Sequence, residues 1–362
     1  GEAVDLNYCR PITFHRHEGK FSVHLDNESS IPVSGAGGAK LDEDLKRING
    51  LQKALDYYKL ACTPIYHPNQ KPDMNSYQAT MLEWGIAKLD DIRNEMPNAG
   101  GLVIAPNISV AKYMAEILEE LDGEKPTLVH SQEVNVENKI DAFRNTKKRW
   151  IVSVAMISEG VDIKRLRILV YLPTAQTELS FRQSMGRVVR TMGDEDSTRA
   201  YVVMPTHKIF EEYARRVELE MSPAQRKEGA KKDHKICGVC EAKNPLEAET
   251  CVECESEFST RKERFRPCPE CERLNPLSED ECQFCGAKMD YEFKVTLDEA
   301  LRTGAIVSGM DITEEDVLEG ERIKDRVEKQ VLKSGDAALI GLIKRLPHES
   351  YAHLKHILDD EK

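Results

Sequence analysis

Ten cysteines form the clearest chemical pattern in this 362-residue sequence, because eight of them occur as four Cys-x-x-Cys pairs. The spacing C-x2-C-x10-C-x2-C occurs twice, the second copy 31 residues after the first. Two such turns can close a tetrahedron of thiolates around zinc, and four protein ligands are typical of a structural site. The sequence therefore predicts two zinc ions, held by Cys237, Cys240, Cys251 and Cys254 and by Cys268, Cys271, Cys282 and Cys285. The unpaired Cys9 and Cys62 are expected to be small buried side chains.

A second pattern is the arginine-containing segment SFRQSMGRVVR (180–190). Gln183, Arg187 and Arg190 are spaced four and three residues apart, so on a helix they would share one face. Neighbouring guanidinium groups repel each other unless an anion separates them, and their planar shape matches phosphate oxygens. We therefore expect this face to meet a polyphosphate, with ordinary surface ion pairs as the alternative.

A third pattern is the segment SVAMISEGVDI (153–163), which runs on from an apolar stretch. Gly160 permits close approach to the backbone. Asp162 can accept a hydrogen bond from a ribose or hold an arginine.

Together these segments resemble the second RecA-like domain of superfamily II helicases and translocases. QxxGRxxR matches motif VI of that family, EGVD (159–162) matches motif V, and GLVIAPN (101–107) occupies the place of motif IV. The residues of these motifs are similar to those of bacterial and phage restriction-type and repair motors, including the RadD-like group. The resemblance covers about residues 95–220 and implies an α/β fold with a RecA-like parallel sheet.

The resemblance also implies a mechanism. In such motors ATP with Mg²⁺ lies between two RecA-like domains, and the second domain supplies arginines to the transferring phosphoryl group. By position, Arg190 is the expected arginine finger and Arg187 its partner. Nucleotide or cleft contacts are implied for Gln183, Gly186, Gly160 and Asp162. Contacts to a nucleic-acid backbone, with DNA the expected form, are implied for Asn107, His130, Ser131, Ser153 and Ser158.

Two departures from the family pattern limit the expected activity. The sequence contains no GxxxxGK[ST] phosphate loop and no DExx box in context, so the first RecA-like domain is expected to be missing and the chain inactive alone. Val154 stands where relatives often have Thr, which puts one backbone contact in doubt.

The start, without an initiator Met or a signal peptide, suggests a fragment of a cytoplasmic protein. A non-enzymatic docking module built on a degenerate RecA-like domain is the alternative.

The elements that position these residues can be predicted from periodicity. Residues 10–25 suggest a hairpin of two strands around Glu18-Gly19. Apolar stretches at 101–105, 127–130, 150–154, 168–171 and 201–204 indicate buried parallel strands. Helical periodicity is found at 44–59, at 76–94 with Ser76 as N-cap, after Ser109 to Gly123, and near 135–144, 178–189 and 207–219.

We expect four regions along the chain. Residues 1–95 would be the exit from the missing first domain with a connecting hairpin and helices, and 96–222 the second RecA-like domain. Residues 223–290 would hold the two zinc modules and 291–362 an acidic helical tail. No stretch of eighteen apolar residues occurs, so no membrane span is expected.

The zinc modules resemble zinc ribbons and RanBP2-type fingers, with Asn244 and Asn275 each four residues after a cysteine. Between the modules, Arg261, Lys262, Arg264, Phe265 and Arg266 mix bases with an aromatic ring, a combination that can grip a single strand. Strand binding and protein docking remain equal alternatives for the modules.

The chain carries a formal net charge of −12, so any nucleic-acid binding must use local basic faces. The tail is expected to pack as helices or to bind a partner protein.

Overall fold

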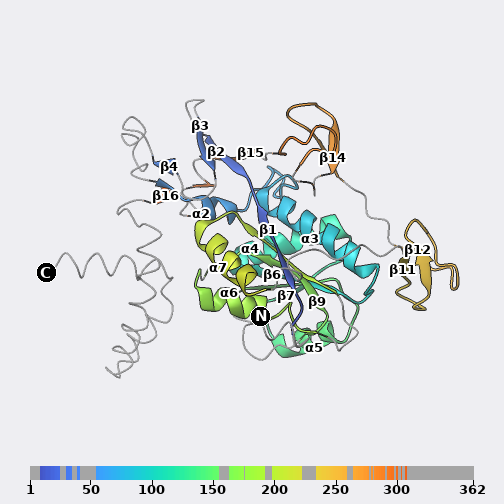
Figure 1. The fold of residues 1–362 in the computed structure, drawn as a ribbon. Helices are drawn as coiled ribbons and strands as arrows, with labels where there is room; N and C mark the ends of the chain where they lie inside the picture. Colours follow the sequence, from blue (N-terminus) through green and yellow to red (C-terminus); the bar gives the residue numbers. More distant parts are fainter. Residues whose placement is uncertain are drawn as a thin grey trace, which may run out of the picture.

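The computed structural model describes residues 9–24, 30–34, 39–40, 54–154, 163–174, 176–191, 198–221, 234–258, 264–276, 279, 281–289, 292–296, 299–300, 303 and 306–307. A six-stranded sheet forms the centre of the fold, in the order β1-β10-β9-β6-β8-β7 (Figure 1). Its strands are β1 (Ile12–His17), β10 (Ala200–Pro205), β9 (Leu166–Tyr171), β6 (Gly100–Ala105), β8 (Trp150–Val154) and β7 (Thr127–Val129). Every neighbouring pair is parallel. The predicted α/β fold with a parallel sheet is confirmed.

Helices cover both faces of the sheet. They are α2 (Tyr57–Ala61), α3 (Tyr77–Arg93), α4 (Ile108–Asp122), α5 (Val136–Arg144), α6 (Glu178–Met185) and α7 (Lys208–Glu220). Val170 of β9 faces Gly85 of α3, whereas the next residue, Tyr171, packs on Phe181 of α6 and Phe210 of α7. Because successive side chains of a strand point to opposite faces, α3 and the α6–α7 pair lie on opposite sides of the sheet (Figure 1).

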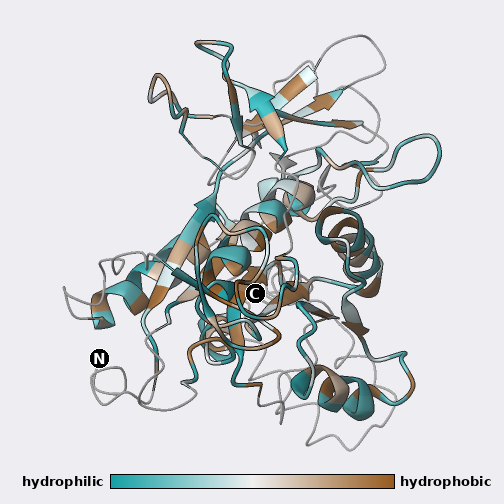
Figure 2. Cartoon of the chain, turned by 90° about the vertical axis from the view of Figure 1, so that its right-hand side faces the viewer, coloured by the Kyte–Doolittle hydropathy of each residue, from teal (hydrophilic) through white to brown (hydrophobic). Residues whose placement is uncertain are grey.

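Burial explains why these sequences adopt these elements. The strand residues of β6 and β9 are buried throughout, as expected for a parallel sheet covered on both faces. Gly101 is required where it lies, since a Cβ there would meet the Trp150 ring at 2.1 Å. Helices α4, α5, α6 and α7 bury one side only, and hydrophobic and hydrophilic residues alternate along the helical ribbons in Figure 2. Helix α3 is instead buried on all sides over residues 77–86.

Several predicted boundaries are confirmed and two are wrong. Helix α3 begins after Ser76, whose hydroxyl accepts from the Ala79 amide. The N-cap of α4 is Asn107 rather than Ser109, because the Asn107 side chain accepts from the Val110 amide at 2.9 Å. Helix α6 ends at Met185, four residues before its predicted end. The predicted helix 44–59 falls mainly outside the described residues, and Ala54–Leu55 within it is strand β5.

The predicted hairpin at residues 10–25 is wrong. Strand β1 pairs in parallel with β10, Ile12 opposite Ala200, at the edge of the main sheet. Strand β2 (Lys20–His24) instead joins a separate sheet between β3 (Ser30–Ser34) and β15 (Glu292–Thr296). Residue 12 therefore already belongs to the same sheet as the predicted RecA-like domain.

The remaining described strands form small sheets. β11 (His234–Ile236) pairs with β12 (Lys243–Pro245), and β13 (Phe265–Pro267) pairs with β14 (Leu274–Pro276), both antiparallel. β16 (Ile306–Val307), β5 and β4 (Ala39–Lys40) form a further sheet. The first described elements of the predicted helical tail are thus strands, and its apolar stripe beyond residue 307 lies outside the described residues.

Candidate functional site

Arg187 and Arg190, the arginines predicted to contact a nucleotide, lie on a turn after α6 and not on the helix. Beyond Met185 the chain tightens, with the Arg187 amide donating to the Ser184 carbonyl at 3.1 Å. Arg187 and Arg190 are half-buried, whereas Gln183 on the helix is exposed. The expected common helical face therefore does not extend to Arg190.

The backbone of Arg190 is held by the residues just before β1. Arg190 forms an antiparallel bridge with Cys9, and the Arg10 amide donates to the Val189 carbonyl at 2.7 Å. The Arg10 guanidinium donates from Nε to the Arg190 carbonyl oxygen at 3.2 Å, and its Nη2 donates to the same oxygen. The Arg10 side chain is only 2% exposed.

Thr198 connects Arg10 with a second buried arginine. Arg10 Nη1 donates to the Thr198 carbonyl at 2.9 Å, and Nε of the fully buried Arg167 donates to the Thr198 hydroxyl at 2.7 Å. Arg167 Nη1 also donates to the Lys164 and Leu166 carbonyls at 2.6 and 2.8 Å. Such donors are satisfied by oxygens in fixed positions, so the network fixes the backbone that carries Arg190.

Of the residues predicted to contact nucleic acid, Asn107 follows the carboxyl end of β6 and His130 and Ser131 follow that of β7, whereas Ser153 lies within β8. Asn107 is exposed, but its side chain caps α4. His130 is buried, with Nε2 3.3 Å from a Glu133 carboxylate oxygen, and the neighbouring Ser131 is exposed. Ser153 is 3% exposed within β8 and offers no surface in this state. Ser158, Gly160 and Asp162 lie outside the described residues.

The two groups of predicted site residues lie at opposite edges of the sheet. Because the strands are parallel, Asn107 and Ser131 share the carboxyl edge. Helix α6 starts after β9 and returns the chain to the amino edge, where Arg190 meets Cys9 ahead of β1. Within the described residues, the sheet separates the arginine turn from the exposed polar loops.

Each four-cysteine group is compatible with zinc. The ligand sulfurs of each group all lie within 4.8 Å of one another. Cys237 and Cys254 are separated by 3.6 Å between sulfurs, and Cys271 and Cys282 also by 3.6 Å. Zinc–sulfur bonds of about 2.3 Å in a tetrahedron require sulfur–sulfur edges of about 3.8 Å. These distances fit a metal and are too long for disulfide bonds of about 2.05 Å.

The backbone is shaped to present the thiols. After each Cys-x-x-Cys pair one residue adopts a left-handed conformation: Glu241, Glu255, Glu272 and Gly286. Amides inside the turns point at sulfur, for example Val239 N to Cys237 Sγ at 3.4 Å. Amide donors favour thiolate over thiol. The Ser256 hydroxyl is the largest cause, and together with the backbone amides of the turn it lowers the pKa of Cys237 to about 5.

Asn244 and Asn275 lock the two halves of each module together. Asn244 is 2% exposed, accepts from the Val252 amide at 2.8 Å and donates to Cys251 Sγ at 3.6 Å. Asn275 repeats these contacts with the Gln283 amide and Cys282 Sγ. A side chain with both a donor and an acceptor is needed to reach sulfur and backbone at once.

The two modules attach at opposite ends of α3. The first contacts its carboxyl end through a hydrogen bond from the Ile236 amide to the Asn94 carbonyl at 2.6 Å. At the amino end, Arg264 donates to the Met74 carbonyl at 2.7 Å and to Asn75 Oδ1 at 3.0 Å. Arg266 donates to the Glu279 carbonyl. Two of the bases expected to grip a strand therefore serve internal contacts, and Arg261 and Lys262 lie outside the described residues.

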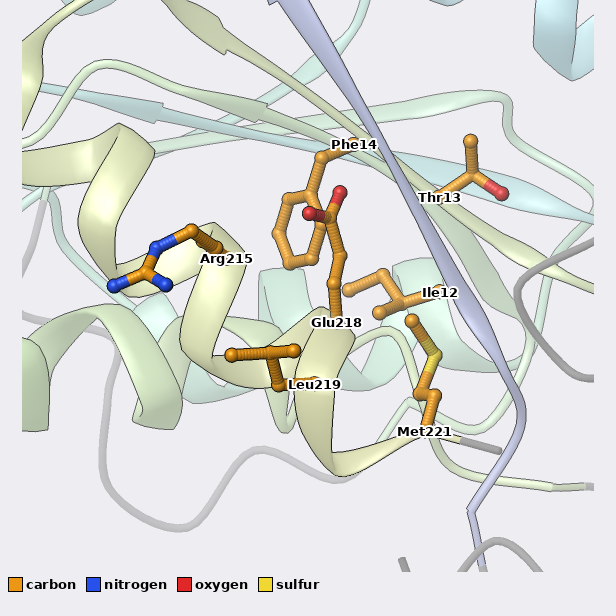
Figure 3. Close-up of a pocket in the computed structure, with 7 residues that line it drawn as sticks. All are labelled: Ile12, Thr13, Phe14, Arg215, Glu218, Leu219 and Met221. Carbon is orange, nitrogen blue, oxygen red and sulfur yellow. The ribbon is translucent and has the colours of Figure 1, made fainter. Parts of the chain in front are cut away.

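A small pocket opens between β1 and the end of α7 (Figure 3). It encloses about 230 Å³ and is lined mostly by apolar side chains, including Ile12, Phe14 and Met221. Ligand pockets are usually about 300–1,000 Å³ with convergent polar groups. Its volume and lining do not fit a nucleotide.

Comparisons with known proteins assign a class to the α/β part. Residues 85–192 match the family model of the helicase conserved C-terminal domain, a span that includes the arginine turn. This part of the chain is therefore similar to the C-terminal domain of helicases.

Individual relatives cover less of the chain. Uncharacterized proteins of Mycobacterium leprae and Mycobacterium tuberculosis are each 36% identical over 115 residues, which are 32% of this chain and 19% of theirs. The chain spans about a fifth of the length of these curated relatives. The structure of Mss116p DEAD-box helicase domain 2 bound to an RNA duplex aligns with a TM-score of 0.29 at 14% identity. That alignment covers 42% of this chain and 59% of that one. No helix of the described residues is long and apolar enough to cross a membrane.

Sequence reasoning missed Arg10, Thr198 and Arg167. They belong to no motif, and Arg10 contacts a residue 180 positions away. Single-sequence periodicity carries no signal for such a contact. The two asparagines were singled out, but only their position after the cysteines indicated a role.

Proposed function

We propose that this chain supplies the second RecA-like domain of an ATP-dependent superfamily II helicase or translocase that acts on DNA. The observation that carries the proposal is the arginine turn, which lies inside the helicase-like segment and is fixed at one edge of the sheet. A pair of half-buried arginines on an anchored turn suits an anion brought by a facing domain.

In this proposal Arg190 stabilises negative charge that develops on the γ-phosphoryl group, and Arg187 assists it. Gln183, exposed on the last turn of α6, reaches toward the same nucleotide, and Gly186, the residue that caps the end of α6, lies beside it. Gly160 and Asp162 complete the cleft. A preceding RecA-like domain supplies the phosphate loop and the ligands for Mg²⁺, because the sequence has no such loop.

Nucleic acid would bind at the carboxyl edge of the sheet. Ser131 and Asn107 are exposed there, and backbone contacts of this kind orient a strand without reading its sequence. The exposed Ser131 and Asn107 therefore carry more of the proposal than His130 and Ser153, which are buried.

The four-cysteine groups would each hold one structural zinc ion. Zinc would supply the charge that allows four thiolates to lie together, and Asn244 and Asn275 would hold the second turn of each module in register.

The surface of the first module favours protein docking over strand binding. Six exposed glutamates surround it within 237–258 against the single Lys243, namely Glu241, Glu247, Glu249, Glu253, Glu255 and Glu257. Val239 and Val252, on the two metal-binding turns, are 73% and 64% exposed. Clustered carboxylates repel phosphate, whereas exposed apolar tips suit a protein partner of basic character.

The test of the proposed function is steady-state ATPase activity of a protein that joins this chain to its preceding RecA-like domain, measured with and without DNA. DNA-stimulated turnover that disappears in Arg190→Ala supports it. If that protein folds and binds partners but hydrolyses no ATP, the docking-module alternative holds instead. Normal turnover in Arg190→Ala would remove the proposed role of Arg190.

A further inference from the structure

A buried contact links the arginine turn to the segment that leads into the domain. Cys9 and Arg10 immediately precede β1, and they contact the backbone of Val189 and Arg190 along a short antiparallel ribbon. Arg10 adds two side-chain donors on the Arg190 carbonyl, from Nε at 3.2 Å and from Nη2. The segment that leads into the domain is thus hydrogen-bonded to the turn.

The geometry requires a guanidinium group. Nε and Nη2, on one edge of the Arg10 guanidinium group, donate to the Arg190 carbonyl, and Nη1 donates to the Thr198 carbonyl at 2.9 Å. An ammonium group is a single point with rotatable donors and cannot span two fixed carbonyls in this way. Because Arg10 is 2% exposed, its removal takes these donors away from a buried site, which is costly.

Thr198 connects the Arg10 hydrogen bonds to the main sheet. Its hydroxyl accepts from Arg167, which is fully buried and anchored on the Lys164 and Leu166 carbonyls at the start of β9. The position of Arg190 is therefore tied to the amino ends of β1, β9 and β10.

We propose that Arg10 is a positioning residue for Arg190, fixing the backbone from which the finger reaches and linking its position to the segment that leads into the domain. This inference rests on the proposed function, because Arg190 must be the finger for its position to matter. In this role Arg10 acts through the backbone of Arg190. A displacement of about 1 Å at a catalytic group lowers a rate by about 100-fold.

The experiment uses the longer protein with its first RecA-like domain and compares Arg10→Gln, Arg10→Lys and Arg190→Ala. The matched control is Arg16→Gln, since Arg16 lies on β1, which follows Arg10, and makes a two-point contact with Glu218 at 3.1 and 3.0 Å. We expect both Arg10 variants to lower kcat by about 100-fold with KM for ATP changed by less than about threefold. Arg16→Gln should lower the melting temperature without changing kcat.

A purely structural role for Arg10 predicts a different pattern. Arg10→Gln would then lose melting temperature as Arg16→Gln does, and kcat per folded molecule would be unchanged, which overturns the proposal. If Arg10→Gln does not fold, Arg10→Ala with added guanidinium ion provides the second measurement. Recovery of at least tenfold in kcat, absent in Arg190→Ala, supports positioning, and recovery of folding without kcat overturns it. Normal turnover in Arg190→Ala removes the proposed role of Arg190, and the positioning role falls with it.

Discussion

The Arg10 side chain donates from Nε to the carbonyl oxygen of Arg190 at 3.2 Å, across 180 residues of sequence. This contact joins the segment just before β1 to the end of the helicase-like segment. It explains how a half-buried arginine on a turn keeps one position without being part of a helix.

Removal of the proposed arginine finger should strongly lower ATP turnover without abolishing nucleic-acid binding. In the longer protein, Arg190→Ala should lower ATP turnover by about 10³-fold or more, the scale expected for loss of an arginine finger. Arg187→Ala should act in the same direction, and lysine at either position should not rescue. DNA affinity should change little, because it depends on many phosphate contacts.

The control for that experiment is Arg182→Ala on α6, the helix that precedes the arginine turn. Arg182 pairs with Glu178 at 2.9 Å and with Glu220 at 2.7 Å on the surface. Its loss should change stability by less than about 1 kcal/mol and leave turnover normal. Full activity in a well-folded Arg190→Ala protein would remove the main support for a motor domain.

The chain alone should show no measurable ATPase activity and only weak nucleotide affinity. Half of the phosphate contacts and all metal ligands are expected on the other side of the cleft. The measurement is phosphate release by purified protein with DNA present. Robust turnover that persists in Arg190→Ala would reveal a nucleotide site elsewhere in the chain.

Metal analysis of reductively purified protein should find two zinc ions per chain. Cys240→Ser and Cys271→Ser should each lower the content to one, because three thiolates bind less tightly than four. Cys9→Ser, outside both clusters, should retain two. Strong chelation should unfold residues 235–290 while the α/β domain, which has its own core, remains folded. Fewer than two ions in the unmodified chain would contradict the assignment.

Acid should destabilise the α/β domain through buried histidines. Burial lowers the pKa of His207 from 6.5 to about 4, where it packs between Tyr58 and Phe210. Between about pH 6.5 and 4, His207 therefore stays neutral in the folded state, whereas the same side chain takes up a proton in the unfolded state. Stability is then lost as pH falls through this window, by about 1.4 kcal/mol per pH unit for one such histidine.

His207→Phe should consequently lose less stability between pH 7.5 and 5 than the unmodified chain. Trp84 and Trp150 both lie in the α/β domain, so thermal melts followed by tryptophan fluorescence report on it rather than on the zinc modules. His67→Gln, at a histidine whose side chain is 53% exposed, is the control. An equal acid loss in His207→Phe would show that other groups set the slope.

The first zinc module should not contribute to strand binding. Lys243→Glu and Val252→Ser should leave the affinity of the chain for single-stranded DNA unchanged, because the surrounding carboxylates already exclude phosphate. Fluorescence anisotropy at two salt concentrations measures this. A loss of several-fold in either variant would place a strand on the module.

Local patterns predicted the elements well and their partners poorly. Strands β6, β8 and β9 and helix α3 were predicted because apolar runs, periodicity and a Ser cap are local signals. The hairpin failed because the partner of β1 is β10, and nothing within residues 10–25 encodes that pairing. At α4, Asn107 and Ser109 were both good caps by type, and only the geometry distinguishes them.

The candidate site divides in the same way. The eight cysteines were grouped correctly because their spacing is the signal, and the structure brings each set of four together. The roles of Arg187 and Arg190 remain predictions, but their shared helical face was wrong because α6 ends before either residue. Arg10 and Arg167 act through contacts distant in sequence, which single-sequence reasoning does not reach.

The pairing of β15 with β2 has a consequence for what the zinc modules can do. The chain leaves the α/β domain after α7, passes through both modules and returns to form a parallel strand with β2, Phe293 opposite Phe21. The modules are therefore tethered at both ends, as well as at the two ends of α3. A partner captured by them would stay at an effective concentration fixed by this short double tether, of millimolar order for such linkages. Weak affinity at the modules would then suffice to keep that partner beside the α/β domain.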